Sequence, residues 1–156
     1  MFRTSSALSL TTLALAAALF SGGALAQVKH GSKDEAQAMV KKAVAHYKAA
    51  GKDKALADFN QKGGAFTDRD LYVYTTDLNG KCTSHGANEK LVGRDLLQLK
   101  DADGKGFVGE ILEKAKAGKG AWTDYKWPNP VSKEIEAKTT YCEPHDNQVF
   151  CVGAYK

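Results

Sequence analysis

Residues 121–130 read AWTDYKWPNP, and residues 138–141 read KTTY. The two segments together hold two Trp, two Tyr and two Lys, and we expect them to form adjacent strands. Pro128 and Pro130 end the first strand, because proline has no N–H to donate to a sheet ladder. Aromatic side chains on one sheet face can wall a pocket in which a Lys or a Tyr hydroxyl fixes a small anion. We therefore place a candidate binding site beneath the first long helix. The alternative is that these aromatic side chains only fill the core there.

The surrounding sequence predicts an antiparallel sheet. Residues 71–76 (LYVYTT) are β-branched and aromatic, as strands favour. The turn signal DLNG at 77–80 leads into a returning strand at 81–85. Residues 137–143 and 148–155 predict the last two strands. Consecutive strands with short connections form antiparallel sheets, so the predicted fold class is α+β.

Three segments predict helices. Residues 32–35 (SKDE) form a capping box, and apolar side chains then recur at helical spacing from Ala36 to Ala50. Gly51 is suited to end this first long helix. A shorter helix is expected over about residues 53–61 and another over residues 107–118. The predicted order is therefore helix, short helix, hairpin, helix and three strands.

The first 26 residues predict a cleaved signal peptide. Arg3 precedes an apolar run from Ala7 to Phe20, and Ala24-Leu25-Ala26 matches the A-x-A pattern of a signal-peptidase site. This run is shorter than the roughly 20 residues that a membrane-spanning helix requires. We expect a mature chain of residues 27–156, a length that fits one domain, in the bacterial periplasm or secreted through a Sec-type pathway. No second long apolar run follows, so we expect no direct membrane anchoring of the mature form.

The charge pattern argues against nucleic-acid binding. The chain carries 22 Lys and Arg against 18 Asp and Glu, and the two signs are interleaved, as in Lys52-Asp53-Lys54. Nucleic-acid-binding proteins instead cluster their basic residues. The turn at residues 101–104 (DADG) resembles the start of a calcium loop, but Leu112 stands at the twelfth position, where such a loop needs a bidentate Glu. We expect no metal site and no cofactor.

The cysteines predict one disulfide. In an exported chain, thiols that lie near each other pair. If Asp146 and Asn147 form a two-residue turn, antiparallel register places Cys142 opposite Cys151 at a non-hydrogen-bonded position, where Cα atoms are closest. We therefore predict a Cys142–Cys151 disulfide. Cys82 is left as a small buried residue, an unpaired thiol or the source of an intermolecular disulfide.

The sequence lacks the common catalytic motifs, including the nucleophile elbow, the zinc-protease helix motif, the P-loop and the dinucleotide-binding glycine loop. The four histidines are far apart in the sequence, and only His85, at a strand end beside a loop, is a plausible site residue. We therefore expect a protein that is not an enzyme. A thiol-redox enzyme that uses Cys142 and Cys151 remains an alternative, although a hairpin cross-link is normally inert.

Several motifs together resemble the single Cache domain, an extracytoplasmic sensory module of bacterial chemoreceptors and kinases. The resemblance covers about residues 33–156. The segments that carry it are DLNG (77–80), SH (84–85), LVGRDL (91–96), LKDADGK (99–105), YKWPNP (125–130), KTTY (138–141) and GAY (153–155). It implies a PAS-like fold in which a long N-terminal helix packs on a five-stranded antiparallel sheet, with a ligand pocket on the sheet face that often binds a small organic acid.

Carried over position by position, the resemblance implies seven ligand-binding residues, namely Tyr72, Tyr74, His85, Lys126, Trp127, Lys138 and Tyr141. The family usually has His-Pro where this chain has His85-Gly86, so we expect a looser loop there. We expect an exported, non-enzymatic binding domain for a small organic acid, without a transmembrane or signalling segment of its own, that works with a membrane receptor. The alternative is an extracytoplasmic interaction or accessory protein on a Cache scaffold without a competent pocket.

Overall fold

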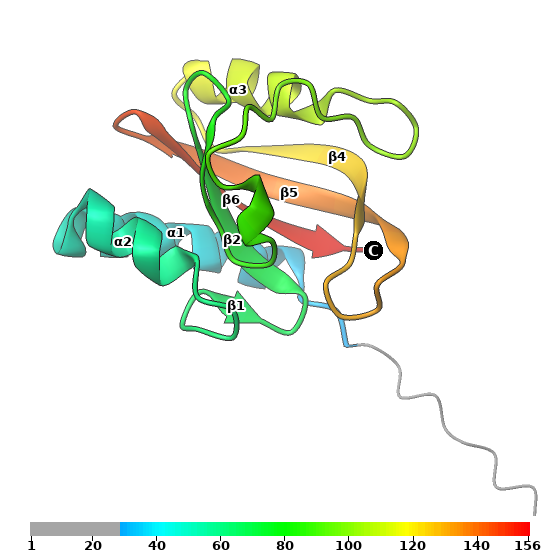
Figure 1. The fold of residues 1–156 in the computed structure, drawn as a ribbon, viewed down its shortest axis with the longest axis horizontal. Coiled ribbons are helices and arrows are strands. Elements are labelled where there is room, and N and C mark those ends of the chain that lie inside the picture. Colours follow the sequence, from blue (N-terminus) through cyan, green and yellow to red (C-terminus); the bar gives the residue numbers. More distant parts are fainter. Residues whose placement is uncertain (1–28) are drawn as a thin grey trace, which may run out of the picture.

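An antiparallel sheet runs through the centre of the molecule, with α-helices on both of its faces (Figure 1). The computed structural model describes residues 29–156. In chain order, its elements are α1 (Lys33–Ala50), α2 (Lys52–Phe59), β1 (Thr67–Asp68), β2 (Leu71–Asp77), β3 (Cys82–His85), a short 3-10 helix (Glu89–Leu91), α3 (Phe107–Lys116), β4 (Ala121–Pro128), β5 (Ile135–His145) and β6 (Gln148–Tyr155). The predicted signal peptide lies outside the described residues. None of the helices between residues 29 and 156 combines the length and apolar character needed to cross a membrane.

The sheet has six strands within the described residues, in the order β1-β2-β6-β5-β4, with β3 also paired to β2. Every pairing is antiparallel, which confirms the α+β class. The prediction of five strands was wrong by one. The additional strand, β1, is only two residues long, and it pairs with the start of β2 after a turn at Arg69, whose φ is 56°. Two residues carry no periodic pattern that a sequence could reveal.

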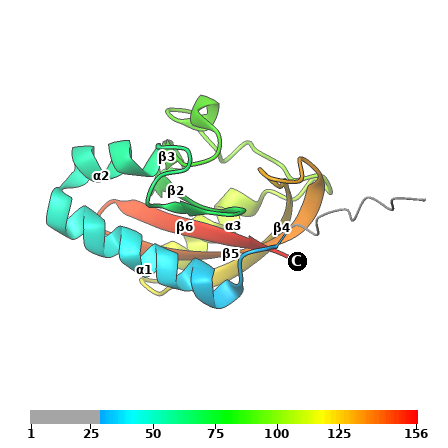
Figure 2. The same ribbon diagram turned by 90° about the horizontal axis from the view of Figure 1, so that it is seen from below.

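The first helix lies along one face of the sheet, over β5 and β6 (Figure 2). Its predicted capping box is present: the Ser32 hydroxyl accepts from the Glu35 N–H, and the Glu35 carboxylate accepts from the Ser32 N–H. Gly51 follows the last turn with φ 82°, a conformation that glycine adopts without strain. Phe150 of β6 is fully buried on this face. Burying such a ring stabilises the fold by roughly 1.5–3 kcal/mol.

The opposite face is covered by α3 and by the segment of residues 86–106 (Figure 1). Alternate residues of a strand point to opposite faces, so the aromatic cluster of β4 and β5 is divided. Trp122 and Tyr141 belong to the core under α1, whereas Tyr125 and Trp127 belong to the core under α3. The prediction of a site beneath the first helix was therefore wrong, because Lys138 and its partner Tyr72 lie on the α3 face, whereas Tyr141 packs in the core under α1.

The last hairpin has the predicted register. Cys142 is paired with Cys151, their Cα atoms are 4.2 Å apart, and their side chains form a disulfide. The turn is at Asp146 and Asn147, and Asp146 has φ 51°. Cys82 is a buried free thiol, and burial raises its pKa to about 12. Such a thiol is neither ionised at neutral pH nor accessible to a second chain, which disfavours the intermolecular disulfide.

Candidate functional site

Five of the seven predicted ligand-binding residues meet on the α3 face of the sheet. Tyr72 and Tyr74 alternate along β2, His85 ends β3, and His85 is paired with Tyr74 across the two strands. Trp127 comes from β4 and Lys138 from β5. All of these side chains are buried or half-buried. The strand alternation that divides the aromatic cluster also brings these five together.

Lys138 is the central charged group of this face. Its side chain is buried, with 1% of the residue exposed, and Nζ donates to the Tyr72 hydroxyl at 2.8 Å and to the Tyr155 hydroxyl at 3.2 Å. Among the described residues, it forms no ion pair with a carboxylate. Burial lowers its pKa to about 7, although the charge of Asp70 partly opposes this shift. The amine therefore lies in a low-dielectric site without a counter-ion in contact, an arrangement that favours an anionic ligand.

Gly153 of β6 makes room for the lysine. A Cβ atom at this position would collide with the Cε of Lys138 and with the Thr140 hydroxyl, so only glycine leaves space for the buried stem. Gly153 is the first residue of GAY (153–155), the last of the segments that resemble the single Cache domain, and the site requires a glycine there.

Tyr155 is a site residue that the sequence analysis missed. Its hydroxyl accepts from Lys138 and donates to the Pro128 carbonyl at 2.8 Å. A signal for it was present, because the register that pairs Cys142 with Cys151 also pairs Lys138 with Tyr155. Cross-strand partners on one face are the side chains that touch.

His85 is held in one orientation as a neutral ring. Its Nδ1 accepts from the backbone N–H of Asn88 at 3.0 Å and of Ala87 at 3.3 Å, which assigns the proton to Nε2. Burial and the charge of Lys138 lower its pKa to about 3. Gly86, the position at which the resemblance leads us to expect proline, donates its N–H to the Val73 carbonyl at 2.9 Å. The glycine therefore supplies a hydrogen bond that proline could not make, and the loop is tied to the sheet.

A void of about 20 Å³ is lined by four of the five gathered residues, all except Lys138. That volume holds about one water molecule. The Tyr74 hydroxyl is buried and has no hydrogen-bond partner in the described part of the chain. Burial raises the pKa of this hydroxyl well above its usual value, and the neighbouring Tyr125 raises it further. The void is lined by Tyr72, Tyr74, His85, Leu91, Leu96, Leu99, Phe107, Tyr125 and Trp127.

Two of the predicted site residues lie elsewhere. Lys126 is exposed, and its Nζ pairs with the Asp103 carboxylate at 3.0 Å. Tyr141 faces α1 and packs on Trp122, with ring centroids 5.2 Å apart. The structure therefore does not bring them together with the other five.

The Pro-Asn-Pro turn after Trp127 anchors a second buried network. The Asn129 amide donates to the buried carboxylate of Asp70 at 3.1 Å and to Glu136 at 2.9 Å. Asp70 also accepts from the Gly31 N–H at 2.7 Å and contacts His30 Nδ1 at 2.7 Å. The turn thus holds the segment that leads into α1. Residues 29–156 contain no cluster of three or more His, Cys, Asp or Glu side chains arranged to hold a metal ion.

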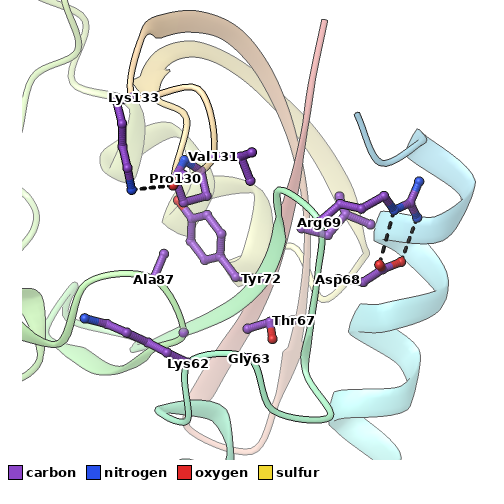
Figure 3. Close-up of a pocket in the computed structure, with 12 residues that line it drawn as sticks. Lys62, Gly63, Thr67, Asp68, Arg69, Tyr72, Ala87, Pro130, Val131 and Lys133 are labelled. Carbon is purple, nitrogen blue, oxygen red and sulfur yellow. Dashed lines mark hydrogen bonds and ion pairs between the residues drawn. The ribbon is translucent and has the colours of Figure 1, made fainter. Parts of the chain in front are cut away.

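A larger cavity lies on the other side of Tyr72. It is an open groove of about 510 Å³ between β1, the start of the 86–106 segment and the β4–β5 turn. Figure 3 shows the Tyr72 ring in this groove beside Pro130, with Lys62 and Lys133 at its edges. Tyr72 lines both the groove and the small void.

Sequence comparisons find receptors and sensor kinases. The chain is 36% identical over 76 residues, or 49% of its length, to the methyl-accepting chemotaxis protein McpP of Pseudomonas putida. It is 31% identical over 85 residues, or 54% of its length, to the sensor histidine kinase MctS of Rhizobium johnstonii. These matches cover only 14% and 18% of the two relatives' own lengths.

Solved structures share the fold. A methyl-accepting chemotaxis protein from Vibrio parahaemolyticus superimposes with a TM-score of 0.67 at 21% identity, covering 79% of this chain and 87% of that one. A Cache chemosensory domain solved to explain carboxylic acid recognition gives a TM-score of 0.61 at 23% identity, covering 78% and 86%. The family model described as Single Cache domain 2 matches residues 17–154. The chain therefore belongs to the single Cache domain family.

Proposed function

We propose that this protein is an exported, non-enzymatic sensory domain that binds a small carboxylic acid at Lys138. The observation that carries the proposal is the buried Lys138 ammonium, which contacts two tyrosine hydroxyls and no carboxylate of residues 29–156. The His85 Nε2–H and the unpartnered Tyr74 hydroxyl add further donors to the same face. A carboxylate, which only accepts hydrogen bonds, complements such a set of donors.

The expected affinity follows from these contacts. Each charge-assisted hydrogen bond contributes about 1.5–3 kcal/mol, so two or three of them support binding in the micromolar range. The aromatic walls exclude water, which strengthens each contact. The void of about 20 Å³ is smaller than a two-carbon acid, so the lining side chains must move apart on binding.

The relatives support the same class of function. McpP and MctS are a chemoreceptor and a sensor kinase, and one solved structure with this fold concerns carboxylic acid recognition. We propose that residues 1–26 are a cleaved signal peptide, that residues 27–156 form one exported Cache domain, and that a membrane receptor is its partner.

The experiment is a thermal-shift and calorimetric screen of acetate, propionate, lactate, pyruvate and amino acids against the wild type and two variants. A ligand at 100 times its Kd adds about 2.7 kcal/mol, a shift of several degrees for a domain of this size. Lys138→Met should abolish the shift, whereas Lys126→Met, which removes an exposed lysine, should leave it unchanged. If no acid shifts the wild type, the small-acid proposal fails and the alternative of an interaction or accessory protein is favoured.

A further inference from the structure

Tyr72 lies between the small void at the site and the open groove. Its hydroxyl accepts from Lys138 Nζ at 2.8 Å, while the same residue lines both the void of about 20 Å³ and the groove of about 510 Å³. Figure 3 shows the ring standing in the groove, with Ala87 and Pro130 near it. The residue is 3% exposed and lines both spaces, so its side chain lies between them.

Tyr74 provides a natural comparison. It points to the same face of β2 two residues later, is also buried, and also lines the void. It does not line the groove. Truncation of either tyrosine to alanine would remove one phenol ring from the wall of the void. Only truncation of Tyr72 would connect the void with the groove.

Part of the groove beyond Tyr72 is apolar, although Lys62, Asp68, Arg69 and Lys133 also line it. Close to the Tyr72 ring its lining includes Ala87, Pro130 and Val131, and Val131 is 48% exposed. The ammonium groups of Lys62 and Lys133 lie at the edges (Figure 3), and Lys133 is held by the Pro130 carbonyl at 2.5 Å. An aliphatic tail that passed the position of the Tyr72 ring would therefore meet apolar side chains first.

We propose that the Tyr72 ring sets the chain-length limit of the acid, and that the groove is a latent subsite for the aliphatic tail of a longer monocarboxylic acid whose carboxylate is at Lys138. This inference rests on the proposed function. The ring acts as a barrier, and the hydroxyl acts separately as a partner of Lys138. The two actions can be separated, because phenylalanine keeps the first and loses the second.

The test is calorimetric titration of unbranched acids from acetate to octanoate into the wild type, Tyr72→Phe, Tyr72→Ala and Tyr74→Ala. The wild type and Tyr72→Phe should both prefer short acids, with weaker binding overall in the phenylalanine variant. Tyr72→Ala should bind hexanoate at least tenfold more tightly than acetate. Tyr74→Ala should extend the limit by one or two carbons at most. Tyr72→Leu, which keeps an apolar side chain but opens the ring position, replaces Tyr72→Ala if the latter does not fold.

A second pair of variants tests the groove itself. In the Tyr72→Ala background, Val131→Glu should weaken hexanoate binding at least tenfold and leave acetate binding unchanged, whereas Ile135→Glu should affect neither. Ile135 is also exposed, at 59%, but it lies outside the groove. The inference is overturned if Tyr72→Ala keeps the wild-type length profile, or if Tyr74→Ala shifts it equally. A wild type that binds no acid of any length would instead refute the proposed function.

Discussion

The pH dependence of acid binding tests the site most directly, because one group controls it. Lys138 has a pKa of about 7 in the unliganded protein, and a carboxylate pairs with its protonated form. His85, with a pKa of about 3, stays neutral above pH 5, and burial raises the pKa values of Tyr72 and Tyr74 above 10. Between pH 6 and 9, Lys138 is therefore the group of this site that titrates.

The direction and size of the effect follow from linkage. Above pH 7 the free protein loses the proton that the complex needs, so binding takes up a proton and the apparent Kd rises with pH. About half of the lysine is protonated at pH 7 and about 1% at pH 9, so the Kd should rise about 50-fold over this range, or about 2.3 kcal/mol.

The assay is isothermal titration of the acid found by the screen, at pH 6, 7, 8 and 9, in pairs of buffers with different ionisation enthalpies. The enthalpy difference within each pair gives the proton uptake, which should be near one half at pH 7 and near one at pH 9. A Kd that changes less than threefold from pH 6 to 9 would refute the assignment of Lys138 as the anion-binding group. Lys126→Met should reproduce the wild-type pH profile.

Further expectations concern the residues around the site. Asp70→Asn should move the pH midpoint of binding below 7 in the same titrations, because the Asp70 charge raises the pKa of Lys138. Gly153→Ala should cost about 1–3 kcal/mol in urea unfolding by overpacking and weaken acid binding, since the new methyl group collides with the lysine stem. Replacing Cys142 and Cys151 together with serine should cost about 2–3 kcal/mol in the same unfolding assay, and wild-type stability of the double variant would show that the disulfide is dispensable. Without ligand, the wild type should gain stability as pH rises from about 7 towards 10.5, because there the unfolded chain binds the proton that buried Lys138 has released; Lys138→Met should lack this gain.

Much of the fold could be predicted because local rules and tertiary packing agree in this chain. The capping box before α1 and the Asp-Asn turn before β6 each determine the position of an element by local hydrogen bonding or backbone conformation. The Cys142–Cys151 pairing followed from counting outward along both strands from the Asp146–Asn147 turn, and the same count continued to Lys138 would have found Tyr155.

The same reasoning could not predict which face of the sheet holds the candidate site. The alternation of side chains along a strand shows that Tyr125 and Trp127 share one face of the sheet and that Trp122 points to the other face. It does not show which of the two faces α1 covers. Lys126 and Tyr141 were included by motif resemblance, although the alternation that brings Lys138 and Trp127 into the site excludes them. The volume of the void depends on how residues 86–106 close over the sheet, a contact between segments far apart in sequence.

The hydrogen bonds of Asp70 define where the independently stable unit begins. Two of its three partners, His30 and Gly31, precede the first helical residue, and the third is Asn129, almost a hundred positions later. A recombinant fragment that started at Ser32 would keep every helix and strand but leave a buried carboxylate with one partner, at a cost of about 1–3 kcal/mol or more. Any truncation for crystallisation or for fusion to a second protein should therefore retain His30 and Gly31.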